Sequence, residues 1–267
     1  MRRLLIRPGG IGDCILALPA LECLRADYTE VWAPESVVPL IRFADRVCSI
    51  TSTGLDLVGL PGVAPPPAVL DRLRSFDSIV SWYGSNRVDF RAEVARFGFP
   101  FQFFPALPGP NERTHATDFF LEQIGCTAGA TPRIPCPQIP REKFAVIHPF
   151  SGSPRKNWPL AKYTELAERL PLPVRWCAGP EESLEGAVRI ADLYELACWI
   201  SGARIYIGND SGITHLAAAS GVPTIAIFGP TDPAVWAPRG GSVAVVAGTL
   251  EEITVQQILD AANRLLQ

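Results

Sequence analysis

The stretch Gly208-Asn209-Asp210-Ser211-Gly212-Ile213-Thr214-His215 decides the fold prediction, because it joins two expected strands through a polar turn. The apolar run 204–207 is typical of a buried strand, residues 213–220 of a small-residue helix, and residues 224–228 of the next strand. Open α/β folds bind ligands at such turns, beyond the carboxyl ends of their strands. An ordinary crossover with a capping Asp or Ser explains the same residues equally well. The rest of the chain therefore has to decide between a binding turn and a structural one.

Composition indicates a folded protein with a large core and gives no sign of a nucleic-acid partner. The 267 residues are 48% hydrophobic and 19% charged, with a net charge of only −3. Arginines nevertheless gather in the first hundred residues. This imbalance is consistent with an anionic acceptor or a membrane surface, and also with ordinary solvated helix faces.

The seven cysteines are scattered, with no C-x-x-C pair, and several lie in apolar runs. This pattern favours buried thiols in a reducing cytosol over a disulfide framework. The first residues lead directly into a short strand, so we expect no signal peptide. No apolar stretch is long enough to span a bilayer, so we also expect no transmembrane segment.

The amino terminus predicts a strand, a glycine-rich turn and a helix over residues 3–25, with Pro19 kinking or breaking the helix. Gly10 and Gly12 fit part of the dinucleotide fingerprint G-x-G-x-x-G, but Ile15 replaces its third glycine, which argues against an NAD site. The glycines instead allow close approach of a backbone or an acceptor substrate. Asp13 can cap the helix or act as a general base, and the loop alone does not choose.

Further along, residues 47–50 and 57–60 are weak strand candidates, and residues 78–81 form a stronger one. The polar and aromatic loop that follows contains Trp82 and Arg87, which are acceptor contacts or parts of an ordinary loop. Residues 131–140 contain four prolines and predict an extended linker. Because the α/β pattern restarts after it, we expect two domains, residues 1–135 and 141–267. Packing of the final helix back on the first domain is also consistent with the sequence.

The loop Ser151-Gly152-Ser153-Pro154-Arg155-Lys156 follows a predicted strand and precedes a predicted helix. Its hydroxyls, glycine and cations are what a phosphate-binding loop needs, although a capped helix with a solvated lysine has the same composition. The Walker pattern is absent, so the loop does not indicate an ATPase. With three histidines, no H-E-x-x-H and no Asp-x-Asp, the sequence gives little support to a metal-dependent mechanism. His215 is by itself more typical of a structural hydrogen-bonding residue.

Four motifs in order resemble glycosyltransferase family 9, the family of ADP-heptose:lipopolysaccharide heptosyltransferases. They are Arg7-Pro8-Gly9-Gly10-Ile11-Gly12-Asp13, His148-Pro149-Phe150-Ser151-Gly152-Ser153 with Lys156-Asn157-Trp158-Pro159, Gly208 through His215, and Phe228-Gly229-Pro230-Thr231-Asp232-Pro233. The resemblance implies a GT-B fold, in which two Rossmann-like domains face each other across a cleft. The amino-terminal domain then binds the acceptor, and the carboxyl-terminal domain binds the nucleotide sugar.

Carried over residue by residue, the resemblance makes Asp13 the catalytic base and gives the other motifs to the donor. Gly10, Gly12, Trp82 and Arg87 are expected on the acceptor side. The expected donor and phosphate contacts are Ser151, Gly152, Ser153, Lys156, Glu181, Asp210, Ser211, Gly212 and His215. Glu182 is an alternative to Glu181 near the nucleoside. The short acceptor half and the lack of a dense lysine cluster are departures from the family's pattern.

With this resemblance, we expect an inverting, metal-independent glycosyltransferase that needs no cofactor. The expected donor is an ADP-linked nucleotide sugar, ADP-heptose, and the sugar transferred is heptose. The acceptor is a glycan or glycolipid of lipopolysaccharide-core type, so a cytoplasmic enzyme at the inner membrane surface is expected. Two other functions fit the same motifs. A nucleotide-sugar epimerase or hydrolase of GT-B fold consumes the donor without an acceptor, and a non-catalytic sugar-nucleotide-binding protein turns nothing over.

Overall fold

The computed structural model describes residues 1–137 and 140–267 and contains two five-stranded parallel sheets. The first sheet has the order β3-β2-β1-β4-β5, and the second has the order β10-β9-β8-β6-β7. The strands of the first sheet are β1 (Arg2–Ile6), β2 (Tyr28–Ala33), β3 (Arg46–Ser49), β4 (Ser78–Ser81) and β5 (Phe101–Phe103). Those of the second are β6 (Ala145–His148), β7 (Val174–Trp176), β8 (Ile205–Asn209), β9 (Thr224–Phe228) and β10 (Val243–Ala247).

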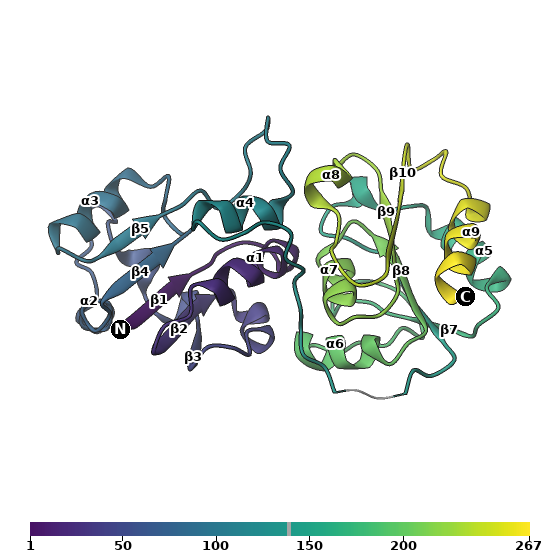
Figure 1. Cartoon of the computed structure of the whole chain (residues 1–267), viewed down its shortest axis with the longest axis horizontal. Helices are drawn as coiled ribbons and strands as arrows, with labels where there is room; N and C mark the ends of the chain where they lie inside the picture. The colour runs from purple at the N-terminus through teal and green to yellow at the C-terminus, as the bar shows by residue number, and fades with distance from the viewer. Residues whose placement is uncertain (138–139) are drawn as a thin grey trace.

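Each sheet forms one domain, and the two domains stand side by side (Figure 1). Their central strands are continuous apolar runs buried on both faces, such as Leu4-Leu5-Ile6 and Ile205-Tyr206-Ile207, as parallel sheets covered by helices require. The helices of the first domain are α1 (Ile11–Cys23), α2 (Pro67–Arg74), α3 (Val88–Arg96) and α4 (Ala116–Gln123). Those of the second are α5 (Leu160–Arg169), α6 (Leu193–Ser201), α7 (Gly212–Ala219), α8 (Pro233–Trp236) and α9 (Val255–Leu266).

In each sheet the chain first builds one side and then crosses to the other, between β1 and β4 and between β6 and β8. Ligands of open α/β sheets bind beyond the carboxyl ends of strands at such a crossing. The loops after β1, β6 and β8 all begin there, so the motifs singled out in the sequence start at the points that this topology favours.

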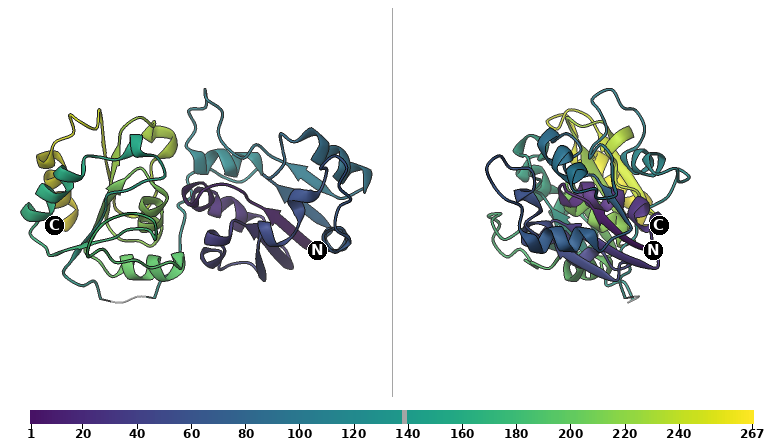
Figure 2. Two further views of the ribbon diagram at one scale, coloured as in Figure 1. Left: turned by 180° about the vertical axis from the view of Figure 1, so that it is seen from behind. Right: turned by 90° about the vertical axis from the view of Figure 1, so that its left-hand side faces the viewer.

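The domains touch where the first turns of α1 and α7 meet, and both views of the ribbon place these helices at the junction (Figures 1 and 2). A methyl group on Gly212 would lie 2.7 Å from Cβ of Ile11, and one on Gly12 would lie 2.9 Å from Cδ2 of His215. Glycine at both positions therefore permits this close approach. One apolar cluster continues across the junction from α1 to α7.

The linker prediction holds for the described residues of the 131–140 segment, which contain no helix or strand; residues 138–139 lie outside the described part of the chain. All five strands of the first sheet precede residue 135, and all five of the second follow residue 141. The exact domain limits remain a prediction. Within the linker, the backbone N–H of Ile134 donates to the carbonyl of Ala219 at 2.9 Å, which ties this segment to the second domain.

Three sequence expectations are corrected by the structure. The final helix α9 packs on α5 and β10 of its own domain, because its apolar face covers the second sheet. Pro19 does not break α1, which continues through it because burial stabilises the helix, while the alternative of a kink stays a prediction. Residues 57–60 form no strand, since a 3₁₀ turn and loop occupy this segment. The sequence patterns also gave no prediction of α3.

The cysteine pattern is also only partly as expected. Cys23 and Cys126 form a disulfide, while the other five cysteines are free thiols. The disulfide joins the last residue of α1 to the segment that follows α4, and the two helices pack side by side although 103 residues separate the two cysteines. Sequence spacing could not reveal this pairing. Among the described residues, no helix is both long enough and apolar enough to cross a membrane.

The close packing at the junction predicts that an added methyl group there lowers the stability of the protein. Gly212→Ala should lower the unfolding free energy by about 1–3 kcal/mol, because the new methyl group overlaps Ile11. Gly241→Ala is the matched control, since a Cβ there meets nothing within 4 Å. Thermal unfolding of both variants beside the unmodified protein tests this. Equal melting temperatures for the two variants would show that the junction is not tightly packed.

Candidate functional site between the two domains

A cavity of about 520 Å³ lies between the domains and brings most of the predicted site residues together. Asp13 and Gly12 line it from the first domain, and Lys156 and Asp210 line it from the second. Its remaining lining residues are Leu16, Leu107, Gly152, Ser153, Ser211, Gly212, His215, Thr231 and Trp236. The cavity therefore joins the expected catalytic base to the expected phosphate loop.

Asp13 caps α1 and also faces this cavity. Its Oδ2 accepts a hydrogen bond from the backbone N–H of Gly10 at 2.9 Å, which satisfies one free donor of the first turn. Its Oδ1 has no hydrogen-bond partner within the part of the chain that the structure describes. The two interpretations of Asp13 are thus compatible, because the cap uses one carboxylate oxygen and leaves the other for a ligand.

Arg7 lies directly beneath Asp13 and was not selected from the sequence. Its guanidinium donates to the carbonyls of Asp13 at 3.0 Å and of Ala106 at 2.8 Å, so one side chain ties together two loops that border the cavity. The side chain is fully buried against Phe120, and burial lowers the pKa of Arg7 from its ordinary value. The signal in the sequence that could have indicated its role is its position, as a cation directly after the apolar run Leu4-Leu5-Ile6.

The opposite wall is held together by an ion pair. Lys156 Nζ lies 2.7 Å from Oδ2 of Asp210, and the hydroxyl of Thr231 donates to the same oxygen at 2.6 Å. Ser151 stabilises the loop itself, because its hydroxyl oxygen lies 2.7 Å from both Asn157 Oδ1 and the carbonyl oxygen of Ser153, and its single proton is shared between these two acceptors. Asp210 therefore holds the ammonium group of Lys156 at the cavity.

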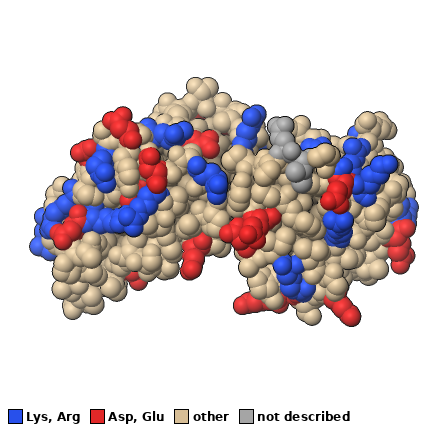
Figure 3. Space-filling model, turned by 90° about the horizontal axis from the view of Figure 1, so that it is seen from below, with Lys and Arg blue, Asp and Glu red and all other residues tan. Residues whose placement is uncertain are grey.

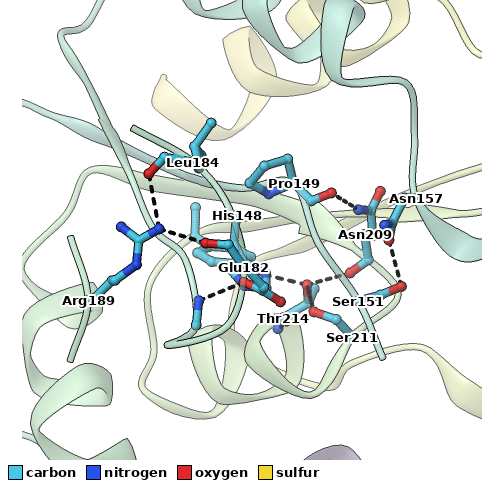
Figure 4. Close-up of polar contacts among 12 residues, drawn as sticks. His148, Pro149, Ser151, Asn157, Glu182, Leu184, Arg189, Asn209, Ser211 and Thr214 are labelled. Atoms are coloured by element: carbon cyan, nitrogen blue, oxygen red, sulfur yellow. Dashed lines mark hydrogen bonds and ion pairs between the residues drawn. The ribbon is translucent and has the colours of Figure 1, made fainter. Parts of the chain in front are cut away.

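Asn209 fixes the loops after β6 and β8 to each other, as Figure 4 shows from Pro149 to Thr214. Its Nδ2 donates to the carbonyl of Pro149 at 2.8 Å. Its Oδ1 accepts from the backbone N–H of Trp158 and the hydroxyl of Tyr163, both at 2.9 Å. All of its side-chain hydrogen-bonding capacity except one N–H is used inside the protein, so its role is to hold the loops and not to bind the ligand.

The first turn of α7 confirms that Ser211 of the Gly208–His215 motif is a helix cap. Ser211 Oγ accepts from the backbone N–H of Thr214 at 3.3 Å. His215 is the residue after Thr214 in the helix and borders the cavity. Its Nδ1 has no hydrogen-bond partner among the described residues. Burial lowers the pKa of His215 to about 4, against the opposing effect of the Asp210 and Asp13 charges. The ring is therefore neutral at physiological pH.

A second cavity of about 450 Å³ continues from the first and shares Gly12, Gly152, Ser211 and Gly212 with it. Its walls are mostly apolar and come chiefly from the second domain, with Ile11, Gly12 and Ser36 added by the first. Its shape and lining suit a nucleoside.

Glu182, and not Glu181, reaches this second cavity. Its Oε2 accepts from the backbone N–H of Gly179 at 2.6 Å and from Nε2 of the buried His148 at 3.1 Å, while Glu181 is exposed to solvent. Partial burial raises the pKa of Glu182, but these hydrogen bonds outweigh it and the net shift is downward. Arg189 orients the same turn by donating to the carbonyls of Glu182 and Leu184 (Figure 4).

Two expected acceptor contacts do not lie at either cavity. Trp82 is buried in the core, where its indole N–H donates to Gln123 at 2.7 Å. Arg87 donates to the hydroxyl of Tyr83 at 2.6 Å and lies over the ring of Phe90. Both side chains thus stabilise the first domain. Gly10 binds the Asp13 carboxylate, and Gly12 lies at the junction. Among the described residues, no group of three or more His, Cys, Asp or Glu side chains is arranged to hold a metal ion.

Solved structures of two glycosyltransferases share this fold. A family 9 glycosyltransferase from Veillonella parvula superposes with a TM-score of 0.78 at 18% identity, covering 99% of this chain and 97% of that one. The E. coli ADP-heptose lipopolysaccharide heptosyltransferase II gives a TM-score of 0.74 at 17% identity, covering 100% and 98%. At this identity the likeness shows the fold, and the fold is GT-B, as the sequence predicted.

The sequence comparisons show the family. Residues 127–264 match the model of glycosyltransferase family 9 (heptosyltransferase), and the chain belongs to that family. Lipopolysaccharide heptosyltransferase 1 of Pseudomonas aeruginosa is 39% identical over 93 residues, covering 29% of this chain and 26% of the relative. The enzyme of the same name from Salmonella typhimurium is 32% identical over 117 residues, covering 37% and 36%. The matched part is thus well under half the length of these relatives.

The hydrogen bonds of Asn209 predict a large cost for an apolar replacement. Asn209→Leu should lower the unfolding free energy by about 3 kcal/mol or more, because three buried partners lose their hydrogen bonds. Asn263→Leu, on the exposed face of α9, should change it by about 0.5 kcal/mol or less. Urea unfolding measures both, and a small loss at Asn209 would contradict the role given to it.

The neutral His215 predicts an acid-dependent loss of stability. Below pH 6.5 the unfolded chain binds a proton at this position that the folded protein resists until about pH 4, so stability falls as the pH decreases through that window. At pH 5 the cost is about 2 kcal/mol. His215→Gln should therefore show a smaller drop in melting temperature between pH 7 and pH 5. An unchanged drop would mean that His215 titrates normally.

Proposed function

We propose that this chain is an inverting, metal-independent glycosyltransferase that moves heptose from ADP-heptose onto a lipopolysaccharide-core or related glycan acceptor. The observation that carries the proposal is the interdomain cavity, in which Asp13 of the first domain faces Lys156 and Asp210 of the second. Family membership supports glycosyl transfer, and the names of the similar proteins support heptose and lipopolysaccharide.

The two walls of the cavity have complementary chemistry for such a transfer. Asp13 would accept the proton of the acceptor hydroxyl while the oxygen attacks the anomeric carbon. The bond from that carbon to the nucleoside diphosphate breaks, and the diphosphate leaves with the bonding electrons. Because base and leaving group lie on opposite walls, attack comes from the face opposite the nucleotide, which inverts the anomeric configuration.

The second domain provides the charge that the departing diphosphate requires. Lys156 is held at the cavity by Asp210, and the first turn of α7 presents backbone N–H groups and the positive end of a helix dipole. These groups would stabilise the developing negative charge in place of a metal ion. The apolar cavity beside Glu182 would hold the nucleoside, with the carboxylate accepting from ribose hydroxyls. No cofactor other than the donor enters this scheme.

We further propose that the acceptor is a glycolipid reached at the cytoplasmic face of the inner membrane. Lys and Arg side chains cover much of the outer end of the first domain (Figure 3). Some of them are neutralised locally, as in the ion pairs of Arg74 with Asp71 and of Arg96 with Glu93, so the attraction to an anionic surface is modest. No nucleic-acid partner is proposed.

Asp13→Asn tests the base while preserving the cap, since the amide oxygen can still accept from Gly10. Transfer from ADP-heptose should fall by about 10²–10⁴-fold because an amide cannot take the proton. ADP affinity, measured by calorimetry, should stay unchanged. Asp13→Ala should lose transfer to a similar degree and also lose stability, since it removes the cap.

Asp45→Asn is the matched control, because Asp45 also accepts a backbone N–H, from Thr29 at 2.8 Å, but lies away from both cavities. It should keep full activity. Full transfer by Asp13→Asn would refute the mechanism. Donor breakdown in the absence of any acceptor would indicate a hydrolase or epimerase, and ADP binding without turnover would indicate a binding protein.

A further inference from the structure

We propose that Leu107 and Trp236 form an acceptor subsite that takes an uncharged sugar ring. The proposal deepens the function proposed above and rests on it. It also replaces the acceptor contacts expected at Trp82 and Arg87, which the structure places in the core and on the first domain's own aromatic residues.

Both side chains line the cavity that contains Asp13, and they come from different domains. Leu107 follows β5 and is 49% exposed, although it is a large apolar residue next to a polar cavity. Trp236 ends α8 and also borders a small cavity of about 200 Å³ formed with residues 108–113. The tryptophan therefore lies beside the loop that carries Leu107, and the two side chains give the cavity an apolar edge.

An apolar edge beside a catalytic carboxylate suits a sugar ring, whose C–H groups form an apolar face while its hydroxyls point outward. An aromatic ring packs against such a face and leaves the hydroxyls free for polar contacts. A ring packed on Trp236 and Leu107 would lie in the same cavity as Asp13, where one of its hydroxyls could reach the free carboxylate oxygen.

The charges around this cavity argue that the ring is uncharged. Asp13, Asp210 and Lys156 are its charged lining residues, and the lysine is already paired with Asp210. Nearby arginines are also engaged. Arg7 is buried and bound to two carbonyls, and Arg113 lies 3.2 Å from Asp232. A bound diphosphate adds more negative charge, so a carboxylate or phosphate on the acceptor ring would be repelled.

A matched pair of small glycosides tests both parts of the proposal. Methyl β-D-glucoside and methyl β-D-glucuronide share one ring and differ by a carboxylate. Saturation-transfer NMR on the full chain with ADP bound measures the affinity of each. We expect the glucoside to bind about tenfold more tightly than the glucuronide. Trp236→Ala should weaken glucoside binding by about tenfold, Trp236→Phe should largely restore it, and Leu107→Asn should weaken it without affecting folding.

ADP affinity is the control in every variant and should not change. The inference is overturned if the glucuronide binds as tightly as the glucoside, if the unmodified protein binds neither, or if Trp236→Ala leaves glucoside binding intact. It is also overturned if Trp236→Ala weakens ADP-heptose instead, which would place the tryptophan at the donor. Failure of the unmodified protein to bind ADP would refute the proposed function, and the subsite with it.

Discussion

The contact on which the rest of the site depends is the approach of the first turns of α1 and α7 at Gly12 and Gly212. Each helix amino terminus carries a partial positive charge of about half a unit, so placing two of them together is unfavourable unless negative groups lie nearby. The Asp13 carboxylate and the Ser211 hydroxyl satisfy N–H groups of these turns. The remaining positive potential is directed at the cavity, where the proposed diphosphate would lie.

Asp13 shows that a structural and a chemical role can belong to one side chain. Its cap bond fixes the direction of the carboxylate, and Arg7 holds its backbone from below. A base on a flexible loop would lose part of its effect to wrong orientations, whereas the carboxylate proposed as the base here is already oriented by its cap. Lys156 follows the same principle, because Asp210 and Thr231 hold it in place.

Sequence patterns predicted those features that depend on residues close together in the chain. The apolar runs predicted most strands, and the glycine and serine motifs predicted the loops that carry Asp13, Lys156 and Asp210. What depends on tertiary contacts was missed or misplaced. Trp82 looked like a loop residue but is buried by α4, and Glu181 and Glu182 can be told apart only by which one points toward His148. Leu107 and Trp236 come from different domains to line one cavity, and Cys23 and Cys126 come from different parts of the chain to form a disulfide, so sequence spacing predicts neither pair.

The apolar cavity proposed for the nucleoside is completed by Ile11, Gly12 and Ser36 of the first domain, although most of its wall belongs to the second. Contact between the domains and affinity for the nucleotide are consequently linked in both directions. A bound nucleotide must strengthen the junction by the same free energy by which the junction strengthens nucleotide binding. Under the proposed function, separation of the two helix turns would weaken nucleotide binding and so favour release of the spent nucleotide.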